Sequence, residues 1–185
     1  MTNPTLSLAT LLALVTTSTV ALAEPASPAL RADVEVDPTA YVLDGYSVHA
    51  GIERGRWRLD LGAFALALPA SIHGNDGFSA SFDGFGAKLQ YFVFAEGEGG
   101  FVGVDASMTR LLVQLDGSDD ASRQRQVGVG VNLGWRFPIT HGVYATPWLG
   151  LGRTVSGNGD GMLGGRTFTM TPWTVFPAVH VGRRF

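Results

Sequence analysis

A serine, a histidine and a carboxylate lie close together in the stretch "SVHAGIE". Ser47, His49 and Glu53 occupy positions i, i+2 and i+6, so an extended strand would place all three side chains on one face. A hydroxyl nucleophile, an imidazole base and a carboxylate that orients the base are the groups of a serine hydrolase. Ser107 follows Asp105 but has no histidine near it, and no Gly-x-Ser-x-Gly elbow occurs. A hydrolase is therefore one hypothesis, and it depends on the elements that would position these groups.

The four histidines raise the question of a metal site. No His-x-His or His-Glu-x-x-His spacing is present, although His49 and His180 would approach each other if the first and last strands of a sheet paired. His73 with Asn75 and Asp76, and Asp160 in "GNGDG", offer oxygen ligands for calcium, but turn formation explains both stretches. The chain has no cysteine, which excludes disulfides and thiolate sites. We predict no metal and no cofactor.

Composition limits the class of protein. The 185 residues suit one domain, and 45% are hydrophobic while only 16% are charged. Glycine is abundant, at 25 residues, and the net charge is −3. Such a chain has no basic field to attract nucleic acid, so we expect no nucleic-acid partner.

The N-terminus predicts export. The run "LSLATLLALVTTSTVALA" ends in Ala21-Leu22-Ala23, the small-x-small pattern that signal peptidase cleaves. We predict a signal peptide over residues 1–23, cleaved after Ala23, for export by the Sec route. An uncleaved anchor helix is the alternative, but the run is short of about 20 strongly apolar residues. A Pro-rich lead-in over residues 24–31 would then precede a domain over residues 32–185.

Beyond residue 31 the hydrophobic period is two, which is typical of strands. In "QVGVGVNLGWRF" Val127, Val129 and Val131 share a face with Trp135, while glycine, Asn132 and a charge occupy the other. Small residues and isolated charges suit the narrow interior of a barrel whose apolar face points outward. Seven strands are predicted, many of them long enough for the roughly 9–11 residues that cross a membrane: 46–54, 56–68, 78–94, 100–115, 124–138, 142–156 and 167–185.

The links between these strands alternate strictly between short turns and long polar loops, as in transmembrane barrels. Bacterial barrels have even strand numbers, so the eighth strand must come from "ADVEVDPTAYVL". Within it, residues 37–44 remain open. Strand is favoured by the alternation, but Asp37 as a cap, Pro38 at the first helical position and Gly45 after the end also suit a short helix. The predicted fold is an all-β, eight-stranded antiparallel up-and-down transmembrane β-barrel.

The chain ends in "AVHVGRRF", with apolar residues at alternate positions before a final Phe185. This ending resembles the C-terminal signature of bacterial outer-membrane β-barrel proteins that the barrel assembly machinery reads. The stretches "DPTAYVLDGYSVHAG", "HGNDGF" and "TPWTVFPAVHVG" are also similar to small exported barrels. The resemblance implies a Gram-negative outer-membrane location, with the lipid bilayer, lipopolysaccharide and the assembly machinery as partners and Phe185 as the assembly signal. The resemblance implies no enzymatic activity and no ligand, and the oligomeric state is left open.

The predicted alternation places one set of residues inside and another outside. The polar residues expected to face the lumen are His49, Glu53, Arg58, Asp60, Lys88, Gln90, Asp105, Asn132, Arg136, His180 and Arg184. The aromatic residues expected near strand ends on the outer face, as a girdle at headgroup level, are Trp57, Tyr91, Trp135, Phe137 and Trp173.

Four functions fit these features. We favour a membrane barrel with a structural or surface-binding role, whose lumenal charges pair and plug the interior. A polar ligand cavity, or an outer-membrane enzyme that modifies lipids, is an alternative. A periplasmic lipocalin-like carrier of an apolar ligand is another, and it would bury Val131, Leu133 and Trp135 instead of exposing them.

Overall fold

The computed structural model describes residues 28–157 and 159–185. The predicted signal peptide and its cleavage site lie outside these residues. No helix in the described part of the chain is long and apolar enough to cross a membrane.

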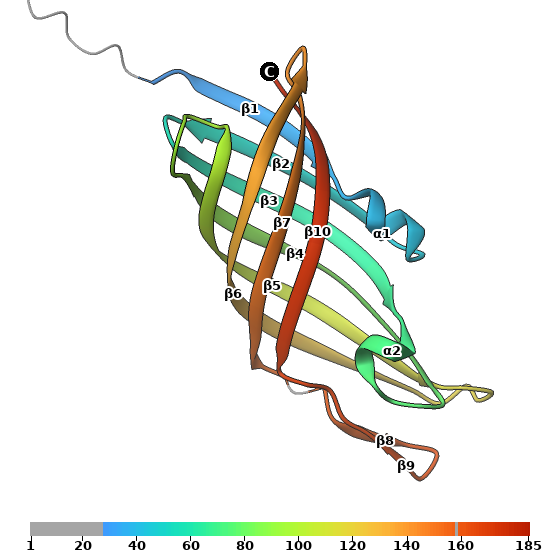
Figure 1. The fold of residues 1–185 in the computed structure, drawn as a ribbon. Coiled ribbons are helices and arrows are strands. Elements are labelled where there is room, and N and C mark those ends of the chain that lie inside the picture. The colour runs from blue at the N-terminus through green and yellow to red at the C-terminus, as the bar shows by residue number, and fades with distance from the viewer. Residues whose placement is uncertain (1–27, 158) are drawn as a thin grey trace, which may run out of the picture.

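Eight strands close into a ring in the order β1-β10-β7-β6-β5-β4-β3-β2, and every pair is antiparallel (Figure 1). This confirms the predicted eight-stranded up-and-down barrel. The barrel strands are β1 (Leu30–Val36), β2 (Tyr46–Arg54), β3 (Trp57–Leu68), β4 (Phe78–Phe92), β5 (Gly99–Leu115), β6 (Ala121–Thr140), β7 (Val143–Ser156) and β10 (Trp173–Arg184). The remaining elements are α1 (Pro38–Val42), α2 (Ala70–His73) and a hairpin of β8 (Gly161–Leu163) and β9 (Arg166–Phe168).

Short links and long links lie at different ends of the barrel. Short turns join β2 to β3, β4 to β5 and β6 to β7 at the end where the C-terminus lies (Figure 1). The segments with α2 and the β8–β9 hairpin lie at the opposite end, whereas α1, which follows the short strand β1, lies at the side of the barrel nearer its middle. We call the two ends the turn end and the loop end.

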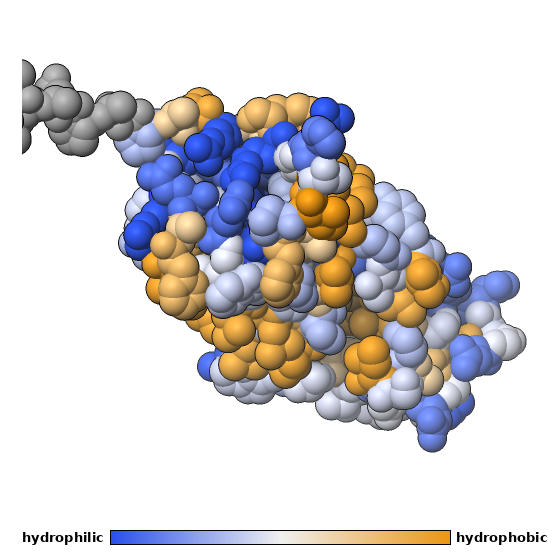
Figure 2. All heavy atoms as spheres, turned by 45° about the horizontal axis from the view of Figure 1, so that its top comes forward, coloured by the Kyte–Doolittle hydropathy of each residue, from blue (hydrophilic) through white to orange (hydrophobic). Residues whose placement is uncertain are grey.

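The wall is apolar outside and polar inside. Val131 is 54% exposed, whereas the next residue, Asn132, is 3% exposed. Leu133 and Trp135 are also exposed, and Arg136 is buried. Figure 2 shows hydrophobic side chains gathered over the strand walls and hydrophilic ones toward the turn end. A carrier of an apolar ligand would have the opposite distribution.

The first strand differs from the prediction. It begins at Leu30, within the expected lead-in, and ends at Val36, and residues 38–42 form α1 instead of a continued strand. The Asp37 carboxylate accepts a hydrogen bond from the Thr39 N–H at 2.9 Å, and Pro38 occupies the first helical turn. Capping by Asp37 and the fixed φ of proline therefore outweigh the alternation in this segment.

The last strand also differs, since it begins at Trp173 and not at residue 167. Residues 166–168 instead form β9 of a hairpin whose turn contains Gly164 (φ 55°) and Gly165 (φ 77°). Two successive positive φ angles are the requirement of a type I′ hairpin turn, which glycine meets without strain. Phe168 of this hairpin packs with Phe78, Ala80, Leu111 and Val113 in a small apolar cluster at the loop end.

The ring is closed by a short seam. β1 and β10 share four residue pairs, from Asp33↔Arg184 to Val36↔Val181. On its other side β10 pairs with β7 over eleven, from Trp173↔Arg153 to Arg183↔Val143. Between Trp173 and His180, therefore, β10 has no paired strand on the side that faces β1, within the part of the chain that the structure describes.

Candidate functional site: the barrel interior

Arg58 of β3 is the centre of an ion-pair network in the turn-end half of the lumen. Its Nη2 and Nε lie 2.5 and 3.0 Å from the two carboxylate oxygens of Asp33, which is a bidentate contact. Nη2 is also 2.9 Å from Asp60 and 3.3 Å from Glu35. Nη1 donates to the Gln90 amide oxygen at 2.9 Å. Arg58 is 1% exposed, so this guanidinium depends on protein groups to replace its hydration.

Arg136 of β6 is a second buried cation beside the first. It pairs with Glu53, and its Nη2 lies 3.1 Å from Glu35. The guanidinium also lies over the Tyr144 ring, 4.1 Å from its centre. Because Glu35 contacts both arginines and also His180 Nδ1 at 2.9 Å, its carboxylate connects the two cations.

The outermost part of the network is at the turn end. Arg184 lies 2.8 Å from Glu98 and 3.5 Å from Glu53. Charges of both signs thus extend from the middle of the lumen to the rim.

The structure divides the predicted lumenal residues into two groups. His49, Glu53, Arg58, Asp60, Gln90, Asn132, Arg136 and His180 are buried, while Lys88, Asp105 and Arg184 are half-buried. Lys88 and Asp105 lie at the edge of the network, where Lys88 Nζ is 3.9 Å from Asp60 and Asp105 accepts from Asn132 Nδ2 at 3.0 Å.

Two central members, Asp33 and Glu35, were missing from the prediction. Both are buried and contact Arg58. The sequence pattern does indicate their lumenal position, because Asp33 and Glu35 alternate with the exposed Val34 and Val36, as lumenal residues do in the other strands.

Ser47, His49 and Asp60 form a hydrogen-bonded chain beside this network. His49 Nδ1 is 2.9 Å from Asp60 Oδ1, and Nε2 is 3.1 Å from Ser47 Oγ. An ionised carboxylate only accepts, so Nδ1 donates to Asp60, and in the neutral imidazole Nε2 is then the acceptor for the Ser47 hydroxyl. The orienting carboxylate is therefore Asp60 of β3, and not Glu53 as the sequence suggested, since Glu53 pairs with Arg136. Gly62 lies against the His49 ring, where any side chain would collide.

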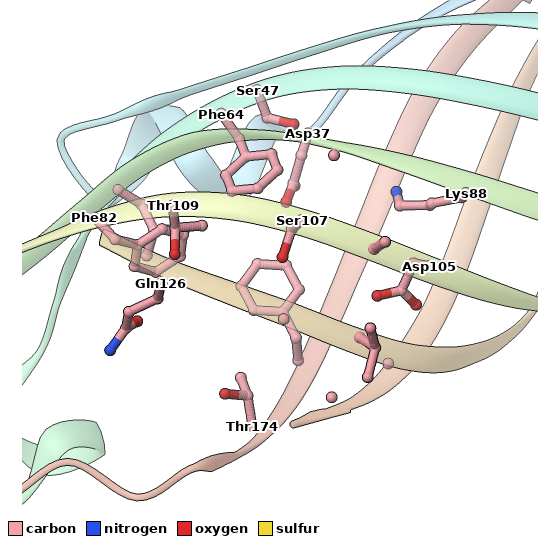
Figure 3. Close-up of a pocket in the computed structure, with 18 of the residues that line it drawn as sticks. Asp37, Ser47, Phe64, Phe82, Lys88, Asp105, Ser107, Thr109, Gln126 and Thr174 are labelled. Carbon is pink, nitrogen blue, oxygen red and sulfur yellow. The ribbon is translucent and has the colours of Figure 1, made fainter. Parts of the chain in front are cut away.

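The loop-end half of the lumen contains a cavity of about 280 Å³. Figure 3 shows Lys88 and Asp105 together at one end of it, with Phe64, Phe82, Thr109 and Gln126 toward the other. Leu66, Leu111 and Phe176 complete its mainly apolar wall. The polar network and this cavity divide the interior, so the lumen is not filled with paired charges along its whole length.

The predicted girdle residues lie on the outer face. Trp57, Trp135, Phe137 and Trp173 are exposed, and Tyr91 is half-buried with its ring centre 4.9 Å from that of Trp57. Phe94 also stacks with Trp135 at 5.4 Å and was not predicted. Most of these aromatics lie near the turn end, whereas Trp173 is at the loop-end limit of β10.

The loop residues considered for calcium make structural contacts. Asn75 Oδ1 accepts from the Thr169 N–H at 2.9 Å, and Asp160 Oδ1 accepts from the Met170 N–H at 2.9 Å. His49 and His180 do approach, with ring centres 4.6 Å apart. Within residues 28–157 and 159–185 no cluster of three or more side chains is arranged to hold a metal ion.

Comparison with known proteins supports the fold. No protein-family model and no curated protein sequence matches the chain. It is similar to the crystal structure of Neisserial surface protein A, with a TM-score of 0.52 and 16% identity over 84% of this chain and 94% of that one. It is also similar to the N-terminal β-barrel domain of Pseudomonas aeruginosa OprF (TM-score 0.47, 13% identity, 84% and 96% covered). A major outer membrane protein from Thermus thermophilus gives a TM-score of 0.48 and 14% identity, with 85% and 100% covered. The likeness to Neisserial surface protein A shows that this chain has the fold of an outer-membrane β-barrel.

Proposed function

We propose that the protein is an integral outer-membrane barrel with a structural or surface-binding role, closed on the periplasmic side by its ion-pair network. The observation that supports this most is the inside-out wall, with valine, leucine and tryptophan exposed and charges buried. Such an apolar surface is costly in water, whereas lipid contact removes that cost. The lipid bilayer and lipopolysaccharide would surround the wall, with the turn end in the periplasm.

The buried network favours a closed lumen and argues against a conducting pore. Arg58, Arg136 and their carboxylate partners fill the turn-end half, and an eight-stranded barrel is only wide enough for its own side chains. We expect the chain in the outer-membrane fraction of cells, with a folded band that shifts on boiling. Recovery in the soluble periplasmic fraction would contradict the proposal.

Phe185 offers a test of assembly that is separate from stability. Its ring is 68% exposed, and its N–H donates to the Ala32 carbonyl at 2.8 Å. Deleting Phe185 should sharply lower the amount of barrel in the outer membrane. Stability after refolding in detergent should fall by at most about 1.5–3 kcal/mol for the ring and roughly 1 kcal/mol for the hydrogen bond to Ala32.

The matched control is Phe137→Ala, which removes another exposed aromatic without changing the C-terminus. Quantitative blots of membrane fractions and urea titrations of the refolded barrels give the two readouts. Normal assembly of the Phe185 deletion, or equal failure in detergent, would mean that Phe185 is an ordinary girdle residue.

A second candidate function, hydrolysis of an ester, is favoured by the Ser47–His49–Asp60 chain. Ser47 and His49 line the apolar cavity, so an ester bound there could meet the hydroxyl. Ser47 Oγ would attack the carbonyl carbon while its proton moves to His49 Nε2. His49 then protonates the leaving alkoxide, and water releases the acid from Ser47.

Covalent labelling tests this candidate directly. The refolded barrel should react with an alkyl fluorophosphonate at Ser47, as located by peptide mass spectrometry. His49→Asn should slow labelling by about 10² or more, the contribution of a general base. Ser107→Ala is the control, because Ser107 lines the same cavity without a histidine partner. Absence of label on Ser47 in the folded barrel would exclude the hydrolase.

A further inference from the structure

The barrel wall is interrupted beside β10. Strand β1 ends at Val36, opposite Val181, while β10 continues to Trp173 with β7 as its neighbour. On the other side of residues 173–180 there is no strand among the described residues. No backbone hydrogen bond between described residues joins this stretch to α1 or β2. The helix α1 contacts β10, β2 and β3, and it is the element that follows β1 beside the interruption.

The interruption lies at membrane depth if the barrel spans the bilayer. Trp173 begins β10 and Phe185 follows its end, so Val175 and Val179, both exposed, lie between the two aromatic ends. Unpaired backbone at this depth is tolerated only where it is covered by protein or lines a cavity. Pro177, in the middle of the stretch, has no N–H to leave unpaired, which suits a free edge.

The cavity lies directly behind this interruption. Asp37, Ala40 and Ser47 line it from one side of the seam, and Thr174 and Phe176 line it from the other. Figure 3 shows Ser47 and Asp37 on one side of the space and Thr174 across from them. Ala40 is the buried residue of α1. The helix therefore places only a small methyl group at the interruption.

The polar end of the cavity offers a donor and an acceptor side by side. Lys88 and Asp105 are register partners on β4 and β5, yet they form no ion pair. Lys88 is 3.9 Å from Asp60 and lies over the Trp148 ring at 4.3 Å, while Asp105 accepts from Asn132. Lys88 Nζ makes no hydrogen bond to any described residue.

We propose that the cavity binds an uncharged single-chain amphiphile that enters from the outer leaflet between α1 and β10. Its head group lies between Lys88 and Asp105, and its chain lies among Phe64, Phe82 and Phe176. This inference rests on the membrane location proposed above.

The chemistry of the ligand follows from the cavity. A volume of about 280 Å³ is near the roughly 300 Å³ at which ligand pockets begin, so it accommodates one chain and not a two-chain lipid. A primary amide both accepts from an ammonium group and donates to a carboxylate, which matches Lys88 and Asp105. A carboxylate head would meet Asp60 as well as Asp105 around the single ammonium group, and an alkane would offer neither Lys88 nor Asp105 a hydrogen bond.

The test uses the full mature chain refolded into phosphatidylcholine vesicles. The probe is a lauramide analogue with a diazirine in its chain, added within the bilayer and activated by light. We expect cross-links in the lumenal residues of β3, β4 and β10, with lauramide competing better than laurate or dodecane. Lys88→Met should weaken competition by lauramide about tenfold, since one hydrogen bond to a charged group is lost.

Two matched pairs of variants test the cavity and its entrance independently. Ser107→Phe fills the cavity and should abolish lumenal labelling, whereas Thr140→Phe, at the turn end outside the cavity, should not. Ala40→Phe obstructs the entrance and should slow labelling at least tenfold. Val42→Phe, on the same helix at an 81% exposed position, should leave the rate unchanged. Ala40→Val provides a smaller obstruction should the phenylalanine variant fold poorly.

The outcomes distinguish this inference from the proposed function. A chain that gives no heat-modifiable band and does not insert into vesicles contradicts the membrane location itself. An inserted barrel with no lumenal cross-links, or with equal labelling in Ser107→Phe, overturns the binding site. Equal labelling rates in the wild type and in a folded Ala40 variant overturn the entrance.

Discussion

Arg58→Met should cost about 3–5 kcal/mol of stability, since breaking a buried ion pair leaves uncompensated charge in the interior. The guanidinium contacts Asp33, Glu35 and Asp60, and methionine replaces its volume without its charge. The loss is therefore electrostatic and not a packing defect. Urea titration of the barrel refolded in detergent measures the free energy of unfolding.

Arg110→Met is the matched control for this experiment. Arg110 also pairs with an aspartate, Asp83, but its side chain is 71% exposed, and exposed pairs contribute about 0–1 kcal/mol. A small effect of Arg58→Met, comparable to that of the control, would mean that the lumenal carboxylates do not depend on this cation.

Val131→Arg should destabilise the barrel in a bilayer by about 2–4 kcal/mol, the cost of arginine on the lipid face near the midplane. Val131 is in the middle of β6, pairs with Val104 and Leu151, and is exposed on the outer wall. Folding into liposomes at increasing urea concentrations gives the free-energy difference.

An arginine introduced into a loop is the control for Val131→Arg. Asp119 is exposed in the link between β5 and β6, outside the wall, so Asp119→Arg should change stability little. If both variants fold equally well into liposomes, the outer face of β6 does not contact lipid, and the membrane assignment is wrong for this wall.

Local alternation made the barrel strands predictable. In β2 to β7 a residue's face depends only on whether its position is odd or even, so Val131 and Asn132 could be assigned to opposite faces without a structure. Alternation did not predict the structure where other local chemistry competed with it. Asp37 and Pro38 start a helix, and Gly164-Gly165 turns a hairpin, because capping and positive φ angles outweigh a pattern of only a few residues.

The strand faces and the alternation of short and long links depend on neighbouring residues, so both, and with them the closed, inside-out barrel, follow from the order of residues in the chain. The identity of the groups that meet across the lumen depends instead on the folded barrel. Glu53 and Arg136 are far apart in the chain, as are Glu35 and His180, and their pairing depends on barrel closure and strand register. The cavity and the interrupted seam were likewise undetectable in the sequence, since they arise where β1 ends before β10 does, a difference between strands distant in the chain.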